Sequence, residues 1–166
     1  TGQKFWHFCE HFIRRAAGMG KAGLEADPDR YEKSNIFTDI LIIGAGPAGL
    51  NEAKEMISSS KKILIVDENT HLGGSLAEES GTIDGKTSDA WLKDTLNSLS
   101  DCKNINMMSR TTVYGYFDSN TLGAIERVAD HKAVPENNEP RQRHLKIFAK
   151  KVINATGSIE RPIVFD

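Results

Sequence analysis

The apolar and polar positions along the chain predict a strand–helix–strand unit ahead of its midpoint. Residues 40–43 are a short continuous apolar run, which is typical of a parallel strand buried on both faces. A glycine-rich turn, Gly44-Ala45-Gly46-Pro47-Ala48-Gly49, follows at once. Leu50, Ala53, Met56 and Ile57 then mark one face of a helix, and residues 63–66 supply a second buried strand. Such a crossover is nearly always right-handed.

The pattern changes in the second half of the chain. Apolar spacing after Ser88, a suitable N-cap, predicts a second helix, and residues 105–108 predict a third parallel strand. Residues 111–117, 122–128 and 145–148 are strand-like with no helix between them, which predicts an antiparallel meander. Residues 130–143 are polar and contain two prolines, so we expect a long exposed loop there. Residues 152–155 predict a last strand that leads into Thr156-Gly157.

The first 37 residues differ in character from the rest. Aromatic and apolar residues at helical spacing predict an amphipathic helix over residues 5–17, which Gly18 and Gly20 would end. Residues 21–35 contain Asp27-Pro28-Asp29 and predict an irregular connector. The aromatic helix must dock either on its own domain or on parts of a larger polypeptide or complex, and both alternatives stay open.

These elements predict an α/β fold, namely a Rossmann-like parallel sheet with an inserted three-stranded antiparallel meander. We divide the chain into residues 1–37, a helix and connector, and residues 38–166, a dinucleotide-binding domain. Nothing after Thr156-Gly157 completes the second half of a doubly wound sheet. We therefore expect a truncated domain in a fragment of a longer protein.

Composition narrows the functional classes. The 166 residues are 39% apolar and 27% charged, with a formal net charge of -2 and no concentration of Lys or Arg, so we expect no nucleic-acid partner. No apolar run approaches a membrane span and Arg14-Arg15 interrupt the N-terminal one, so we expect a cytoplasmic protein without a signal peptide. Cys9 and Cys102 lack a C-x-x-C spacing, and the five histidines form no spaced cluster, so we expect reduced thiols and no metal.

The glycine turn has the residues that a pyrophosphate site needs. Gly44 allows a tight turn out of the strand, Gly46 lets the backbone approach the phosphates, and Gly49 lets the helix pack closely. Pro47 fits the first helical turn, and the helix N-terminus offers unpaired N–H groups and partial positive charge.

Asp67 ends the second strand, about 20 residues after Gly46, where a carboxylate accepts hydrogen bonds from the adenosine ribose. An acidic residue repels a 2′-phosphate, so NAD or FAD is favoured over NADP. The Gly73-Gly74 pair, the meander and the Ala-Thr-Gly end of the last strand together resemble the dinucleotide-binding domain of two-dinucleotide-domain flavoprotein oxidoreductases.

A closer resemblance is carried by motifs along nearly the whole chain. They are Phe5-Trp6-His7, Arg14-Arg15-Ala16-Ala17-Gly18, Asp27-Pro28-Asp29-Arg30-Tyr31, Gly73-Gly74-Ser75, Arg110-Thr111-Thr112-Val113-Tyr114-Gly115-Tyr116-Phe117-Asp118, Pro140-Arg141-Gln142-Arg143 and Ala155-Thr156-Gly157-Ser158-Ile159-Glu160-Arg161-Pro162. Together they resemble the α subunit of heterotetrameric sarcosine oxidase.

That resemblance implies an α subunit that binds NAD non-covalently, and a β subunit that carries FAD and the sarcosine site. It also implies a covalent FMN between the two subunits, γ and δ subunits as further partners, and electron transfer from sarcosine through FAD and FMN to oxygen. It further implies that tetrahydrofolate can accept the one-carbon unit. The α subunit of that family is much longer than this chain, and no catalytic residue is expected here.

Carried onto this chain, the resemblance assigns Gly44, Gly46, Ala48 and Gly49 to the pyrophosphate and Asp67 to the ribose. Glu68 either shares the ribose or is a solvated loop acid, and Val113 either meets the adenine through its backbone or is a core valine. Further candidates are Gly74 and Ser75 on the pyrophosphate side, and Thr156 and Gly157 on the far side of the pocket.

Some other polar residues receive structural interpretations. Arg141 and Arg143 resemble an anion clamp, but a solvated strand edge or a subunit contact is the preferred interpretation. Asp118 and Asp130 are interpreted as turn residues and not as an acid–base pair.

Three other functions remain in competition with the sarcosine oxidase hypothesis. A disulfide oxidoreductase places a redox Cys pair shortly after the Gly-Gly turn, and residues 75–80 contain no Cys, so this hypothesis falls behind. The others are an FAD-binding domain of another flavoprotein oxidoreductase and a non-catalytic nucleotide-binding module.

Overall fold

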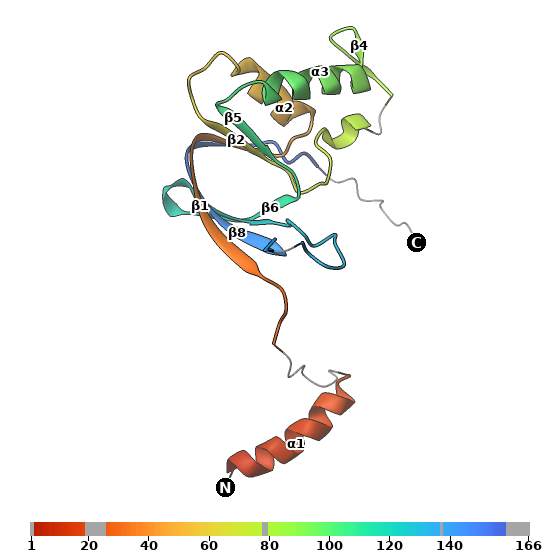
Figure 1. The fold of residues 1–166 in the computed structure, drawn as a ribbon, viewed down its shortest axis with the longest axis vertical. Coiled ribbons are helices and arrows are strands. Elements are labelled where there is room, and N and C mark those ends of the chain that lie inside the picture. The colour runs from red at the N-terminus through yellow and green to blue at the C-terminus, as the bar shows by residue number, and fades with distance from the viewer. Residues whose placement is uncertain (1, 19–25, 78–79, 137, 159–166) are drawn as a thin grey trace, which may run out of the picture.

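The computed structural model describes residues 2–18, 26–77, 80–136 and 138–158. Its centre is a six-stranded sheet with the strand order β5-β2-β1-β8-β7-β6. The strands are β1 (Tyr31–Ile43), β2 (Ile63–Val66), β5 (Ile105–Met108), β6 (Thr111–Phe117), β7 (Thr121–Glu126) and β8 (Gln142–Asn154). The predicted Rossmann-like parallel sheet with an antiparallel meander is thus confirmed (Figure 1).

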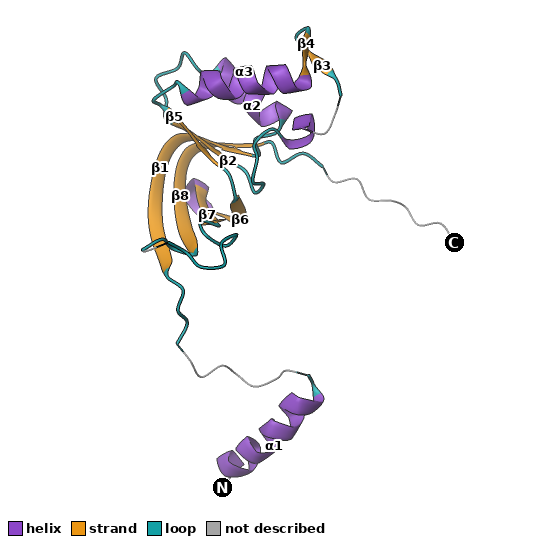
Figure 2. Ribbon diagram, turned by 45° about the vertical axis from the view of Figure 1, so that its right-hand side comes forward, coloured by secondary structure: helices purple, strands orange, loops and turns teal. Residues whose placement is uncertain are grey.

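Two long strands, β1 and β8, run side by side, and both curve so that the sheet forms an arch (Figure 2). They pair in parallel over their whole length, from Tyr31 with Gln142 to Ile43 with Asn154. At one end β1 also pairs in parallel with β2, and β2 with β5. At the other end β8 pairs antiparallel with β7, which pairs antiparallel with β6.

The sequence predicted two strands, at residues 145–148 and 152–155, where the structure has the single strand β8, so this prediction was wrong. One continuous strand serves both the meander and the parallel sheet. Lys150 and Lys151, which interrupt the apolar pattern, are both exposed, and Lys150 forms an ion pair with Asp39 on the neighbouring strand. A strand in an open sheet can carry such polar positions without ending.

The connector prediction was also wrong for residues 31–35, because β1 begins at Tyr31. The domain boundary between residues 37 and 38 falls inside this strand. The misleading signal was the polar composition of Glu32, Lys33, Ser34 and Asn35, which fits a strand with one solvated face.

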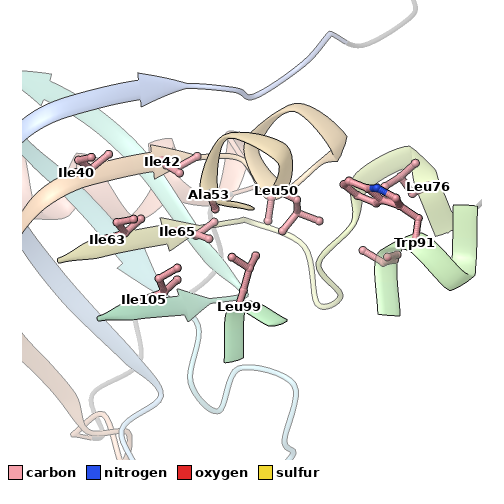
Figure 3. Packing of buried hydrophobic residues seen from close by; sticks show 12 residues of the cluster. Ile40, Ile42, Leu50, Ala53, Ile63, Ile65, Leu76, Trp91, Leu99 and Ile105 are labelled. Atoms are coloured by element: carbon pink, nitrogen blue, oxygen red, sulfur yellow. The ribbon is translucent and has the colours of Figure 1, made fainter. Parts of the chain in front are cut away.

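The two predicted helices lie on one face of the parallel strands. They are α2 (Pro47–Glu55) and α3 (Ser88–Ser100). The N-cap of α3 is Thr87, one residue before the predicted Ser88. The Thr87 side chain caps the helix because it accepts a hydrogen bond from the Ala90 N–H. Figure 3 shows the packing between these helices and the sheet. The labelled residues of this first core cluster include Ile42, Leu50, Ile65, Trp91 and Leu99.

The loop between β2 and α3 contains three short elements. They are η1 (Gly74–Ala77), a single 3₁₀ turn, and a small hairpin of β3 (Thr82–Ile83) with β4 (Lys86–Thr87). A further 3₁₀ turn, η2 (Asp118–Asn120), connects β6 with β7.

A second core cluster fills the other face of the sheet, beneath the arch. Leu41 and Leu64 of the parallel part pack there with Leu122, Leu145 and Ile147 of the meander. Because the two halves of the sheet close on one another, the start of β6 lies close to the C-terminal end of β2, where Thr111 N donates to Asp67 O at 2.7 Å.

The N-terminal helix is α1 (Gly2–Ala16), which confirms the predicted helix with an earlier start. Gly20, residues 21–25 of the proposed connector and residues 159–162 of the last motif lie outside the described residues. The aromatic side chains of α1 are exposed, with Phe5 at 70% and Phe8 at 66%. Within the described chain, no helix has the length and apolarity needed to cross a membrane.

Candidate dinucleotide-binding site

The first glycine of the turn lies against the end of β8. Gly44 has φ +100°, and a Cβ atom at this position would lie 2.4 Å from the Ala155 carbonyl oxygen. The Ala155 N–H donates to the Ile43 carbonyl at 2.8 Å, which fixes this close approach. Only glycine satisfies both the positive φ and the contact.

The other two glycines have different surroundings. A Cβ on Gly49 would lie 1.9 Å from the Gly44 carbonyl oxygen, so α2 packs directly on the turn. Gly46 is the N-cap of α2, with φ -75°, and nothing lies within 4 Å of the position where its Cβ would be. No side chain caps this helix end. The open space over Gly46 and the uncapped N-terminus fit an approaching pyrophosphate.

Asp67 fixes the glycine turn. Its side chain is only 7% exposed. One carboxylate oxygen accepts a hydrogen bond from Ala45 N at 2.7 Å, and the other accepts one from Asn69 N at 2.8 Å. Asp67 therefore connects the end of β2 to the turn after β1, and the neighbouring Glu68 is the exposed acid at this position.

A pocket of about 150 Å³ lies beside these residues. It brings together five of the predicted site residues, namely Gly44, Asp67, Glu68, Val113 and Thr156. A larger pocket of about 410 Å³ shares Ile43, Val113 and Thr156 with it. Val113 is half-buried and packs against the second core cluster, so its side chain belongs to the core and also to the pocket wall.

The Gly73-Gly74 turn lies against the glycine turn. The Gly73 N–H donates to the Ala45 carbonyl at 2.8 Å. A Cβ on Gly74, whose φ is +55°, would lie 3.0 Å from the Gly46 Cα. Ser75 follows in the exposed turn η1.

Four predicted residues at the glycine segments, Ala48, Gly74, Ser75 and Gly157, are exposed and do not line the smaller pocket. Ala48 lies in the first turn of α2, next to the uncapped helix end. Gly157 has φ +70°, and nothing lies within 4 Å of its Cβ position. The predicted residues therefore form one pocket and a neighbouring glycine surface over α2.

The sequence analysis missed the hydrogen bonds by which the meander holds the segment after β2. Thr111 N donates to Asp67 O at 2.7 Å, and Arg110 N donates to Asn69 O at 2.8 Å. Between them, Arg127 Nη2 donates to Glu68 O. Three consecutive carbonyl groups are thus bound to residues of the meander. No local motif signals Arg127, because the contact depends on the arch of the sheet.

The arginine pair in the 140–143 motif is already neutralised by carboxylates. Arg141 forms two bonds of 2.9 Å to Asp29, and this hydrogen bonding raises its pKa. Arg143 bonds Glu32 at 3.1 Å and Glu126 at 2.6 Å; partial burial opposes its charge, but the two carboxylates dominate and raise its pKa. The structure therefore gives both arginines an internal structural role and not that of an anion clamp.

Asp130 accepts a hydrogen bond from the Gln142 side chain at 2.8 Å, and Asp118 starts η2, which agrees with their interpretation as turn residues. Among the described residues, no group of three or more His, Cys, Asp or Glu side chains is arranged to hold a metal ion.

A strand–glycine turn–helix unit, a Gly-Gly segment beside it and a meander under the same sheet define a dinucleotide-binding domain of the two-dinucleotide-domain flavoprotein kind. A family model described as pyridine nucleotide-disulphide oxidoreductase matches residues 38–166. The chain belongs to this family. Its two cysteines lie elsewhere, Cys9 on α1 and Cys102 after α3, and not after the Gly73-Gly74 turn.

The chain is similar to sarcosine oxidase α subunits. The subunit from Rhizobium meliloti (strain 1021) is 46% identical over 156 residues, which are 94% of this chain and 16% of the relative. The subunit from Corynebacterium sp. (strain P-1) is 38% identical over 151 residues, 90% of this chain and 16% of the relative. This chain therefore spans about one sixth of the length of these relatives.

Solved structures support the fold. L-proline dehydrogenase from P. horikoshii superposes with a TM-score of 0.64 over 87% of this chain and 27% of its own, at 23% sequence identity.

Proposed function

We propose that this chain binds NAD and is the nucleotide-binding part of the α subunit of a heterotetrameric sarcosine oxidase. The observation that carries the proposal is one pocket, lined by Gly44, Asp67, Glu68, Val113 and Thr156, beside a glycine turn whose Gly46 has open space at its Cβ position at the start of α2. The similarity to two sarcosine oxidase α subunits supports the choice of enzyme.

Each part of the site has a role in this proposal. The pyrophosphate lies over Gly46, where the N–H groups of Ala48 and Gly49 and the positive end of α2 stabilise its charge. Glu68, exposed at the pocket rim, accepts hydrogen bonds from the ribose hydroxyls. Asp67 already receives two backbone hydrogen bonds, but carboxylate oxygens have further lone pairs, so it supports the same ribose from below.

The adenine occupies the part of the pocket between Val113 and Thr156, with Gly74 and Ser75 on the pyrophosphate side and Gly157 beyond. NAD, when bound, supplies a nicotinamide that can carry a hydride. What the residues of this chain do is bind and orient the nucleotide. Among the described residues no cluster is arranged to hold a metal, and we assign no catalytic residue to this chain.

The reaction proposed for the whole enzyme is the oxidative demethylation of sarcosine to glycine. It yields hydrogen peroxide and either formaldehyde or, with tetrahydrofolate, methylene-tetrahydrofolate. We assign the amine oxidation and the FAD to a β subunit, FMN to the contact between the α and β subunits, and γ and δ subunits to the remaining positions. The proposed location is the cytoplasm.

The test is to purify the native polypeptide that contains this chain, release its bound nucleotides by denaturation and identify them by mass spectrometry. NAD in near-stoichiometric amount supports the proposal. FAD at this site, identified by its loss from a Gly46→Ala variant, would instead support an FAD-binding domain of another flavoprotein oxidoreductase. A bound nucleotide in a native complex, purified with all its subunits, that shows no sarcosine-dependent oxygen uptake would support a non-catalytic nucleotide-binding module.

A further inference from the structure

The first half of β1 is a free strand edge. β1 pairs with β8 from Tyr31 onward, but its pairing with β2 on the other side begins only at Ile40. Along residues 31–38, the described chain therefore has a strand on one side of β1 alone, and Figure 2 shows this part of β1 at the margin of the arch. The outward backbone N–H and C=O groups of such an edge are a template for a further strand.

Exposed aromatic rings lie on the sheet face next to this edge. Phe37 is 70% exposed and stacks on Phe148, with ring centroids 4.9 Å apart and an angle of 9° between the planes. The strand register places Phe148 opposite Thr121, and Thr121 opposite Phe117, which is 58% exposed. The stacked pair of Phe37 and Phe148 thus lies at the free edge, and Phe117 lies further across the sheet on the same line of paired residues, beyond Thr121. Exposed apolar surface of this kind marks interaction sites.

A groove of about 400 Å³ lies where the free edge meets β2. Ile36 and Phe37 of β1 form one side of it, and Ile63 and Ile105, the first residues of β2 and β5, form the other. Lys62 and Lys103 also line this groove. An added strand along β1 would extend the line of β2 and would bring one of its apolar side chains to this groove.

The charges around the edge are positive. Lys33 lies on the edge strand, and Lys62 and Lys103 lie at the groove. The acids of β1 are already paired, Asp39 with Lys150 at 2.7 Å and Glu32 with Arg143 at 3.1 Å. Helix α1 ends in Arg14 and Arg15, so its charge does not complement this surface.

We propose that residues 31–38 are a docking edge for an extended polypeptide segment that carries apolar side chains and at least one carboxylate. The segment adds as a strand beside β1, with an apolar side chain in the groove and its carboxylate near Lys33, Lys62 or Lys103. Backbone pairing selects a polypeptide because nucleic acid has no regular ladder of N–H and C=O groups to match a strand edge. Charge selects an acidic segment over a second copy of this basic edge.

The experiment uses photo-cross-linking in the native polypeptide that contains this chain. p-Benzoylphenylalanine replaces Phe37 in one variant and, as a matched control, Val134 in another. Val134 is 80% exposed and lies on the loop between β7 and β8, outside the edge strand β1. Both exposed positions tolerate a large ring without loss of packing. Cross-linked peptides are identified by mass spectrometry.

We expect position 37 to yield one major adduct, at least tenfold above position 134, with a peptide that has alternating apolar residues and an Asp or Glu. A Lys33→Glu, Lys103→Glu double variant should lower this yield about tenfold. The proposal is overturned by no adduct above the control, by a peptide without acids, by a yield that charge reversal leaves unchanged, or by an adduct with a second copy of residues 31–38 or with nucleic acid.

Discussion

Gly44 and Ala155 lie in direct contact, although 110 residues separate them in the sequence. The position of a Cβ on Gly44 is 2.4 Å from the Ala155 carbonyl oxygen and 2.8 Å from its carbonyl carbon. Because both partners are backbone, neither can move aside as a flexible side chain would. The phosphate turn and the end of β8 therefore depend on each other for their positions, and the pocket at Thr156 is a consequence of this contact.

This contact predicts that alanine substitutions at Gly44 and Gly46, two residues apart in the turn, have very different effects on stability. Gly44→Ala should destabilise the fold by about 3 kcal/mol or more, since it combines a positive φ with a backbone collision. Gly46→Ala should lower the free energy of unfolding by no more than about 1 kcal/mol, because Gly46 has φ -75° and open space at its Cβ position and only the N-cap preference of Gly over Ala is lost. Urea unfolding of the two variants measures the difference.

The same pair tests the site. Gly46→Ala should fold and yet lose NAD affinity by at least about tenfold, or 1.4 kcal/mol, because its methyl group enters the space we assign to the pyrophosphate. Isothermal titration of the folded variant with NAD provides the measurement. Wild-type affinity in Gly46→Ala would remove the pyrophosphate from this position and leave the structural role of Gly44 intact.

Substitutions of the adjacent acids Asp67 and Glu68 should affect different properties: the first should lower stability and the second should lower NAD affinity. Asp67→Ala leaves the N–H groups of Ala45 and Asn69 without their partner, so we expect a loss of about 1–3 kcal/mol in the free energy of unfolding. Glu68→Gln should keep wild-type stability, because the side chain is exposed, and lower NAD affinity about tenfold.

Thermal unfolding and NAD titration of both variants provide the measurements. If Asp67→Ala were as stable as wild type and only NAD binding fell, Asp67 would be the ribose ligand and not the residue that fixes the turn. If Glu68→Gln bound NAD normally, Glu68 would be a solvated loop acid.

The parts of the fold that local pattern determines were predictable from the sequence. Residues 40–43 and 63–66 are continuous apolar runs because helices and meander cover both faces of those strands. The first half of β1 was not recognisable, since Glu32, Lys33 and Asn35 have the composition of a loop and become a strand only by pairing with residues 111 positions later in the chain. The sequence also did not predict that β8 is one continuous strand. Lys150 interrupts its apolar pattern, and the ion pair that Lys150 forms with Asp39 comes from another strand.

The candidate site divides in the same way. Glycine spacing and the acid at the end of β2 are local signals, and the structure places Gly44 and Asp67 at one pocket. Val113 and Thr156, which also line this pocket, were assigned by the family resemblance and not by local spacing. The two carboxylate oxygens of Asp67 accept hydrogen bonds from Ala45 N and Asn69 N because of the path of the backbone around them. Residue types alone do not specify that path. The contact of Arg127 with Glu68 depends on the folding of the meander under the sheet, and no spacing rule carries that information.

The ion pair between Asp39 and Lys150 predicts a pH-dependent contribution to stability. The hydrogen bond from Lys150, aided by the Lys62 N–H, lowers the pKa of Asp39 from its ordinary value of 3.8. A carboxyl with a lowered folded-state pKa stabilises the fold above its unfolded pKa, and this contribution is lost as the pH falls through the folded value. Asp39→Asn should therefore have a slightly lower Tm than wild type at pH 6, and the difference should vanish in strong acid.

Thermal unfolding monitored by circular dichroism from pH 6 to about pH 2 follows that difference. The effect should be small and should shrink with added salt, since the Lys150 side chain is 83% exposed. A difference in Tm that is constant across this pH range would show that the substitution acts through packing and not through the charge of Asp39.

Arg127 should contribute to nucleotide affinity without touching the nucleotide. Its guanidinium donates to the Glu68 carbonyl, and its backbone N–H donates to the Arg110 carbonyl at 2.9 Å, so it connects the residue at the pocket rim to the meander. Arg127→Ala should weaken NAD binding about threefold to tenfold, equivalent to about 0.6–1.4 kcal/mol, because Glu68 then samples other positions.

Arg110→Gln is the matched control for Arg127→Ala. It removes a positive charge nearby and keeps the hydrogen bond to Asn69, because the Arg110 backbone makes that bond. If Arg127→Ala loses NAD affinity and Arg110→Gln does not, Arg127 acts by positioning Glu68. If both variants lose the same affinity, the effect comes from the positive charge near the site and not from the position of Glu68.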